Sequence, residues 1–237
     1  MISSNHMWEK LRQVWTIKDI RNKILFVVGM LVIFRLVAYI PIPGVNLANL
    51  RQFLAGNQIF GLLDLFSGGT MSNFSIVMLG VGPYITSSII FQLLAMIVPK
   101  IEELSKEGES GQQKINMYTR LLAVTLAFLQ SYAMIKLLTN SSLPIITDLS
   151  FFRLVTIMMT VTAGTMFLMW IGELISEKKV GNGISLLIFA GIVSGLPGAL
   201  RNLLINYNSS DFYTFVLFAG VAVLTVVGVV FINEGQR

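Results

Sequence analysis

The chain has 237 residues, of which 54% are hydrophobic and 12% charged, and its mean hydropathy is +0.75. A soluble domain carries roughly 25% charged residues, so this composition excludes an ordinary soluble domain and indicates an integral membrane protein. The chain has no cysteine, which excludes disulfides and cysteine-bound metals, and its only histidine is His6.

The segment ahead of the first apolar run is polar with a helical pattern. Apolar residues recur at helical spacing within residues 8–23, which predicts an amphipathic helix lying on the membrane surface. The His6-Met7 pair fits either a cloning scar before a native start or a natural disordered tail. No small-residue cleavage site follows the first apolar run, so no cleavable signal peptide is predicted.

Six apolar runs predict six membrane spans, and so an all-α, polytopic membrane helix bundle. The predicted spans cover residues 24–39, 59–99, 117–138, 151–175, 183–204 and 212–232. We therefore divide the chain into three parts. They are a tail with the surface helix (1–23), spans one to five (24–205), and span six with the start of the next loop (206–237).

The second predicted span is broken. Residues 59–66 supply only a turn or two, Ser67-Gly68-Gly69-Thr70 interrupts them, and residues 74–98 form a full-length apolar run. Crossing a bilayer takes about 20 apolar residues in a helix. Non-helical backbone at membrane depth persists only inside protein or beside water. The stretch therefore predicts a half-helix, a hinge and a complete helix folded into a protein-walled cavity.

Lysine and arginine in short loops predict the orientation. With both ends in the cytoplasm, that side receives twelve basic residues and the outside receives four. The twelve are Lys10, Arg12, Lys18, Arg21, Lys23, Lys100, Lys106, Lys114, Arg120, Lys178, Lys179 and Arg237, and the four are Arg51, Lys136, Arg153 and Arg201. These charges are dispersed, so the basic balance indicates topology and no nucleic-acid partner.

No catalytic constellation is visible, and no catalytic residue, metal or cofactor is predicted. No pair of acids lies within a span, and no phosphate-binding glycine motif precedes a helix. Ion-coupled transporters usually bury Asp, Glu or His, whereas Asp64 is the only such residue near mid-depth. The charged loop at residues 100–116 fits either a solvated hairpin or a docking contact for a cytosolic partner.

Arg35 is the one cation inside a predicted span, about 17 Å along the helix from Ile24 at roughly 1.5 Å per residue. It either has a structural role, by snorkelling or by bonding to carbonyl groups of the broken segment, or a direct functional one. Gly191 and Gly195 form a GxxxG pattern that is typical of close helix packing.

Two further patterns lie on the second, third and fifth spans. Uncharged polar residues either hold helices together or mark an interface that opens; they are Thr86, Ser87, Ser88, Gln92, Gln130 and Ser131. Isoleucines four apart lie on one face of the second span (Ile85, Ile89) and of the fifth (Ile188, Ile192). Such pairs usually belong to a core or face lipid, but if both faces meet in one cavity they form a hydrophobic constriction.

Seven stretches recur in the order and spacing of a known family. They are AYIPIPGV (38–45), LFSGG (65–69), NFSIVMLGVGPYITSSIIFQLL (73–94), KEGESGQQKINMYTR (106–120), TAGTMFLMWIGE (162–173), GNGISLLIFAGIVSGLP (181–197) and EGQR (234–237). Over nearly its whole length the chain resembles the amino-terminal half of the SecY family, the channel subunits of the bacterial Sec translocon.

The resemblance implies ten transmembrane helices in two inverted halves, of which this chain holds the first half and one further helix. Residues 59–73 would be a plug that closes the channel from outside, and the helix from about Phe74 would form a lateral gate with the third span. The implied plug residues are Leu62, Leu63, Asp64, Leu65, Phe66, Ser67, Gly68 and Gly69. The implied pore ring is Ile85, Ile89, Ile188 and Ile192, and the implied gate residues are Ser87, Ser88, Gln92 and Gln130.

The resemblance also implies a passive channel in the bacterial cytoplasmic membrane that exports unfolded polypeptides and releases apolar segments into lipid. The implied partners are SecE and SecG-type subunits, the SecA motor or the ribosome, precursor polypeptides and the bilayer. We expect that the chain alone does not close a channel and that it can self-associate. A small-solute transporter with a broken helix and a non-conducting membrane scaffold are the alternatives.

Overall fold

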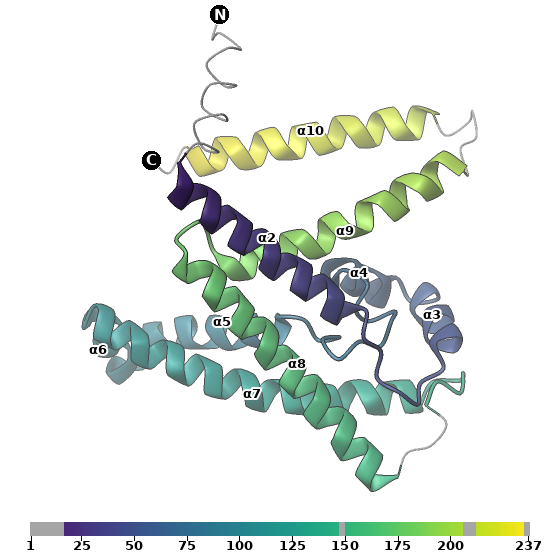
Figure 1. The fold of residues 1–237 in the computed structure, drawn as a ribbon, viewed down its shortest axis with the longest axis horizontal. Helices are drawn as coiled ribbons and strands as arrows, with labels where there is room; N and C mark the ends of the chain where they lie inside the picture. Colours follow the sequence, from purple (N-terminus) through teal and green to yellow (C-terminus); the bar gives the residue numbers. More distant parts are fainter. Residues whose placement is uncertain (1–16, 147–149, 206–211, 235–237) are drawn as a thin grey trace, which may run out of the picture. The chain divides into compact units, whose positions relative to one another are not determined.

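The structure, a computed structural model, describes residues 17–146, 150–205 and 212–234, and every regular element in these ranges is an α-helix (Figure 1). The predicted all-α class is therefore confirmed. The helices are α2 (Lys18–Ala38), α3 (Leu47–Ala55), α4 (Gln58–Ser67), α5 (Gly82–Ile97), α6 (Pro99–Lys106), α7 (Glu109–Thr139), α8 (Phe151–Glu177), α9 (Gly183–Ile205) and α10 (Phe212–Glu234).

The chain divides into two compact units, Met1–Gly195 and Leu196–Arg237. In the first unit α7 packs against both α5 and α8, α2 packs on α8, and the short helices α3 and α4 pack on each other (Figure 1). The second unit holds the end of α9 and α10, whose described large apolar side chains are exposed. All the sites considered below lie in the first unit.

The predicted surface helix lies mostly outside the described residues, which begin at residue 17. Its last part, residues 18–23, runs without interruption into the first predicted span as α2. The Lys23 ammonium lies 2.8 Å from the Asp19 carboxylate one turn earlier. Such i,i+4 pairs stabilise a helix on its exposed face, so α2 extends six residues beyond the apolar run.

Two helices, α7 and α8, are long and apolar enough to cross a membrane, whereas α5 and α6 pass only when taken together, and their 104° bend makes the pair either a broken span or a re-entrant loop. This count covers only the described residues. The last eighteen residues of α2 still include three charged side chains, Arg21, Lys23 and Arg35, which is too many for an apolar span. The apolar parts of α9 and α10 are shorter than a membrane span. The third and fourth predicted spans are therefore supported by α7 and α8, and the other four stay predictions.

The prediction of a continuous helix over residues 74–98 is wrong for its first third. Residues 74–81 form turns, with positive φ at Phe74 (43°) and Gly80 (58°), and α5 begins only at Gly82. Pro83 lies in the first turn of α5, where its missing N–H costs no hydrogen bond. The apolar content of residues 74–81 is real, but it is buried in protein instead of in a spanning helix.

Backbone pairing with another segment holds residues 74–81 in this conformation. The Ile42 N–H donates to the Phe74 carbonyl (2.9 Å), and the Ile76 N–H donates to the Ile40 carbonyl (3.1 Å). On the other side, Gly164 of α8 leaves room for the same backbone, because a Cβ atom there would lie 2.0 Å from the Ile76 oxygen. These non-helical carbonyls and amides are thus satisfied by protein, as membrane depth requires.

Two short helices were not predicted. Asn46 caps α3, because its side-chain oxygen accepts from the backbone N–H groups of Ala48 (3.1 Å) and Asn49 (3.2 Å). Pro99 begins α6 directly after α5, and the 104° bend between them turns the chain sharply. Both helices are shorter than three turns, which is too short for a periodic apolar pattern to reveal them.

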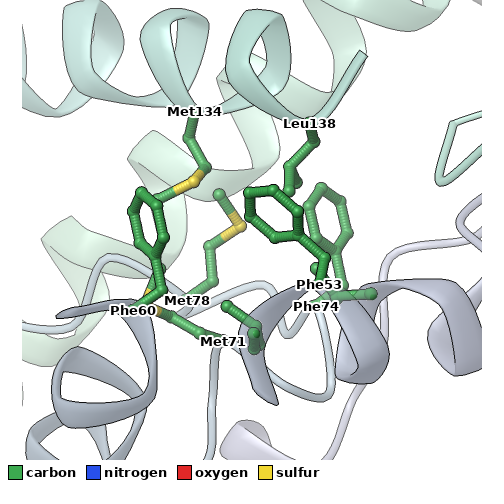
Figure 2. Close-up of a pocket in the computed structure, with 9 residues that line it drawn as sticks. Phe53, Phe60, Met71, Phe74, Met78, Met134 and Leu138 are labelled. Atoms are coloured by element: carbon green, nitrogen blue, oxygen red, sulfur yellow. The ribbon is translucent and has the colours of Figure 1, made fainter. Parts of the chain in front are cut away.

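An apolar cluster joins α3 and α4 to the longer helices. Figure 2 shows Phe53 of α3 and Phe60 of α4 converging below Met134 and Leu138 of α7. The chain between α4 and α5 adds Met71, Phe74 and Met78 to the same cluster. The rings of Phe53 and Phe60 lie 5.7 Å apart. The void they leave is only about 10 Å³, close to one water, and its apolar lining disfavours hydration. The start of α4 is therefore anchored in a well-packed core.

Candidate functional site

An open cavity of about 560 Å³ lies among α5, α7, α8 and α9. Three of the four predicted ring residues line it: Ile85 and Ile89 from α5, and Ile188 from α9. Ile85 and Ile188 also pack against the core formed by α2 and α8, while Ile89 is 50% exposed. The isoleucine faces of two helices a hundred residues apart thus meet in one cavity. Ile192 lies outside the described lining, so its place in a ring stays a prediction.

A tight joint between α8 and α9 brings Ile188 to this cavity. The backbones touch where α9 begins: a Cβ atom on Gly183 would lie 1.8 Å from the carbonyl oxygen of Gly172. The Ser176 hydroxyl donates to that carbonyl (2.9 Å) and accepts from the Gly183 N–H (2.8 Å). Asn182 caps α9 by accepting from the Ser185 N–H at 3.1 Å. The angle of α9 is therefore fixed from its first turn.

A charged pair forms part of the cavity wall. Arg120 of α7 contacts the Glu173 carboxylate of α8 at 2.6 Å, and the two side chains are 49% and 25% exposed. Partial hydration limits both the gain from the pair and the cost of desolvating it. The cavity consequently combines a hydrophobic zone at the isoleucines with a polar, hydrated zone at the ion pair.

The predicted plug consists of α4 and the break that follows it. Along α4, Ile59 is 73% exposed, Leu62 56% and Leu63 45%. Leu65 and Phe66 also belong to α4, but their side chains lie outside the described residues. An apolar helix that exposes this face needs a covering of lipid, of other protein, or of both.

Asp64 has a structural partner within the predicted plug. Its carboxylate accepts from the backbone N–H of Ser72 at 2.8 Å, while its carbonyl accepts from the Gly69 N–H at 2.8 Å. The Ser67 hydroxyl donates to the same carbonyl at 3.0 Å. The one acid near mid-depth therefore closes the turn after α4.

The break itself lies against α2 and α9. Gly68 and Gly69 adopt positive φ values of 73° and 79°, which side chains disfavour. A Cβ atom on Gly68 would lie 2.8 Å from the Cα atom of Gly191, so the GxxxG glycine packs closely, as predicted. Arg35 donates to the Gly68 carbonyl at 2.7 Å. Of the roles left open for Arg35, bonding to a carbonyl of the broken segment is the one that this contact shows.

A family model described as SecY matches residues 75–237, more than half of the chain. The chain belongs to the SecY family. Relatives named "Protein translocase subunit SecY" are 44% identical in Mycobacterium bovis, 45% in Corynebacterium glutamicum and 40% in Escherichia coli, each over 92% of this chain. The matches cover 52%, 52% and 51% of those proteins, so the chain spans about half the length of the curated relatives it matches.

The predicted gate residues of this SecY-family chain do not form one cluster. Ser88 and Gln92 line the isoleucine cavity and are joined by a 3.2 Å hydrogen bond along α5. Ser87 is fully buried and donates to the Pro83 carbonyl of its own helix at 2.8 Å. Gln130 lines a separate cleft of about 360 Å³ together with Leu63 of α4. The hydrogen bonds of the α5 polar residues Thr86, Ser87, Ser88 and Gln92 thus remain within α5, which does not support a role in joining helices.

Sequence reasoning missed the partnership of Arg120 and Glu173, because it counted Arg120 only as a topology charge. The signal was present: both residues end stretches that resemble the SecY family, MYTR and WIGE. Spacing alone could not pair them, since they lie on different helices. Across the described residues no cluster of three or more His, Cys, Asp and Glu side chains forms a metal site.

Proposed function

We propose that this chain forms the amino-terminal half of a protein-conducting channel subunit in the bacterial cytoplasmic membrane. Unfolded polypeptides cross through it, and apolar segments leave it sideways into lipid. The observation that carries the proposal is the meeting of Ile85, Ile89 and Ile188 in one cavity, next to the polar zone at Arg120 and Glu173. The names of the relatives, as protein translocase subunits, support the same class of function.

A hydrophobic ring beside a hydrated cavity suits a channel for unfolded chains. A narrow apolar constriction resists ion passage by dewetting. Aliphatic side chains make no directional bonds, so they can deform around any passing side chain without selecting for sequence. The ring then seals against ions and accommodates a polypeptide, while the polar zone keeps the entrance hydrated.

Residues 59–73 serve in this proposal as the plug, and α5 as one wall of a lateral gate. The chain spans half of its relatives' length, so the ring and gate need the remainder of the channel subunit for closure. An isolated half can instead pair with a second copy, which would cover its exposed apolar helices. The channel makes and breaks no covalent bonds in this mechanism, and a cytosolic motor or translation supplies the energy.

Both ends of the chain lie in the cytoplasm in this proposal, as the distribution of basic loop residues predicts. SecE and SecG-type subunits pack around the helices, and SecA or the ribosome docks on cytoplasmic loops. The predicted loop of residues 100–116, which the structure folds into most of α6, a turn and the start of α7, is one described segment available for such docking. Its side chains are largely exposed, including the Lys106–Glu102 pair at 2.5 Å.

The small-solute transporter remains the main alternative, and Asp64 argues against it. A coupling carboxylate needs to exchange its cation or proton, yet this carboxylate accepts from the Ser72 N–H. A non-conducting scaffold would need no shared cavity for the isoleucine faces. Neither alternative explains why Ile85 and Ile188 converge.

The test places a photo-crosslinking amino acid at Ile85 in the complete channel and stalls a secretory precursor during export. Crosslinks to the precursor are expected from Ile85 and not from Val32, an α2 residue that is 53% exposed and lies outside the cavity lining. Failure to capture the precursor from Ile85, with transport intact, would show that this face is not the conduit.

A further inference from the structure

The predicted plug is tied to the rest of the first unit at its two ends by different kinds of contact. At the start of α4, Phe60 packs against Phe53 in the apolar cluster of Figure 2. At the end, the Gly68 backbone lies between α2 and α9. A ten-residue helix is about 15 Å long, and the next anchor along the chain is Met71 in the same apolar cluster, so release of the far contact would free the end of α4 to move between these two anchors.

At the end of the plug segment, Arg35 is the side chain that bonds to the Gly68 backbone. Arg35 is the only charged residue in the apolar stretch of α2 that follows Lys23, and it is half-buried. Its Nη1 atom donates to the Gly68 carbonyl at 2.7 Å, and its guanidinium lies 5.4 Å from the ring centre of Tyr39. Among the described residues no carboxylate lies within ion-pair distance of it. The guanidinium is therefore directed to a backbone carbonyl.

The close approach of α2 and α9 around this carbonyl leaves no room for a side chain at position 68. Gly68 has φ of 73°, and a Cβ atom would meet the Gly191 Cα at 2.8 Å and Arg35 Nη1 at 3.1 Å. The other bonds of the break, from Gly69 and Ser72 to Asp64, are internal. They hold its shape without reaching another helix, whereas the residues that follow are attached through Met71 in the apolar cluster and through Asn73, whose side-chain oxygen accepts from Arg51 of α3 at 3.0 Å.

We propose that Arg35 is a positioning residue that latches the plug segment in its docked position, through the Gly68 carbonyl and against Gly191. The inference rests on the proposed function and adds the residue that sets how often the plug opens. A charge-assisted hydrogen bond is stronger than a neutral one, and more so away from bulk water. One such bond at the end of α4, between the anchors at Phe60 and Met71, controls the open fraction without altering the cavity itself.

The test measures hydrogen exchange of residues 58–72 and resting ion conductance in the complete channel subunit, reconstituted with its membrane partners. Arg35→Gln removes the charge and the fork of donors. We expect exchange in this segment to quicken on the order of tenfold, the usual consequence of losing one charge-assisted bond, and resting conductance to rise. Precursor transport should persist. Arg21→Gln, the same change on an exposed part of α2, should alter neither reading.

Two further variants separate a latch from general damage. Arg35→Lys keeps the charge and one donor, so its exchange should fall between that of the parent and that of Arg35→Gln. Gly68→Ala should reproduce the loss by sterically displacing the carbonyl, and adding Arg35→Gln to it should produce no further increase. Additive effects in the double variant, or rapid exchange throughout α2 and α9 in Arg35→Gln, would overturn the latch.

The outcome is independent of the conduit test. Unchanged exchange of residues 58–72 in Arg35→Gln refutes the latch even if Ile85 crosslinks to the precursor. Faster exchange together with no crosslink from Ile85 supports the Arg35–Gly68 contact and refutes the proposal that polypeptides pass along the isoleucine face. Faster exchange with unchanged resting conductance shows that the segment is latched but seals nothing, which overturns the proposed control of opening.

Discussion

Replacing Gly183 by alanine tests whether the α8–α9 joint sets the geometry of the isoleucine cavity. The new Cβ atom would lie 1.8 Å from the Gly172 oxygen, and an ordinary contact begins near 3.4 Å. The two backbones must therefore part by roughly 1.6 Å, a displacement that also strains both hydrogen bonds of Ser176. Overpacking costs about 1–3 kcal/mol, and each weakened hydrogen bond about 1 kcal/mol.

We therefore expect a loss of about 3 kcal/mol or more in the free energy of unfolding, a large part of the roughly 5–15 kcal/mol typical of proteins. In a chain of this size that loss lowers Tm by about 6 °C or more. The assay is thermal unfolding in mild detergent, followed by the fluorescence of Trp170, which lies on α8 near the joint.

The matched control is Gly198→Ala on the same helix. A Cβ atom on Gly198 meets nothing within 4 Å, and alanine is the better helix former by roughly 0.5–1 kcal/mol, so this variant should melt at or above the parent temperature. Equal melting temperatures for the two variants would refute the close contact at Gly172 and with it the rigid placement of Ile188.

Three other predictions concern the plug and the ion pair. Deleting residues 62–70 should give a channel that leaks ions but still transports, and unchanged conductance of the full assembly would contradict the plug role. Asp64→Asn should keep slow exchange of the Ser72 amide because the side-chain oxygen remains, whereas Asp64→Ala should lose about 1 kcal/mol of local protection. Similar exchange of this amide in both variants would refute the role of the Asp64–Ser72 hydrogen bond in closing the turn. Arg120→Gln should destabilise by about 1 kcal/mol, because both side chains of the pair are partly hydrated, and adding Glu173→Gln should recover part of it. A double variant as unstable as the sum of the single ones would show that the two residues do not interact.

Local pattern accounts for much of what was predicted correctly. The long apolar runs of α7 and α8 are visible in sequence because a spanning helix needs an uninterrupted run of apolar residues. The break at Gly68 and Gly69 is equally local, since glycine is the residue that adopts positive φ without strain. For Arg35, local pattern supplied only the alternatives, one of which was a bond to the broken segment, because a buried cation needs an acceptor.

The start of α5 shows where local pattern fails. Residues 74–81 are as apolar as a span, yet they pair with residues 40–42 and pass beside Gly164. Apolar content reports burial, and it does not distinguish burial in lipid from burial in protein. The short helices α3 and α6 were missed because their bounds are set by the Asn46 cap of α3, by Pro99 in the first turn of α6, and by packing.

By itself, the sequence determined the all-α membrane class, the position of the break and the isoleucine pairs, because these depend on composition and on spacing within one helix. Only the tertiary structure decided that Ile85 and Ile188 share a cavity, that Arg120 meets Glu173, and that Arg35 reaches Gly68. Each of these contacts joins residues more than thirty positions apart. The glycine contacts Gly172–Gly183 and Gly68–Gly191 help to bring Ile188 and Gly68 to their partners, and a single-helix period carries no information about which helix lies opposite.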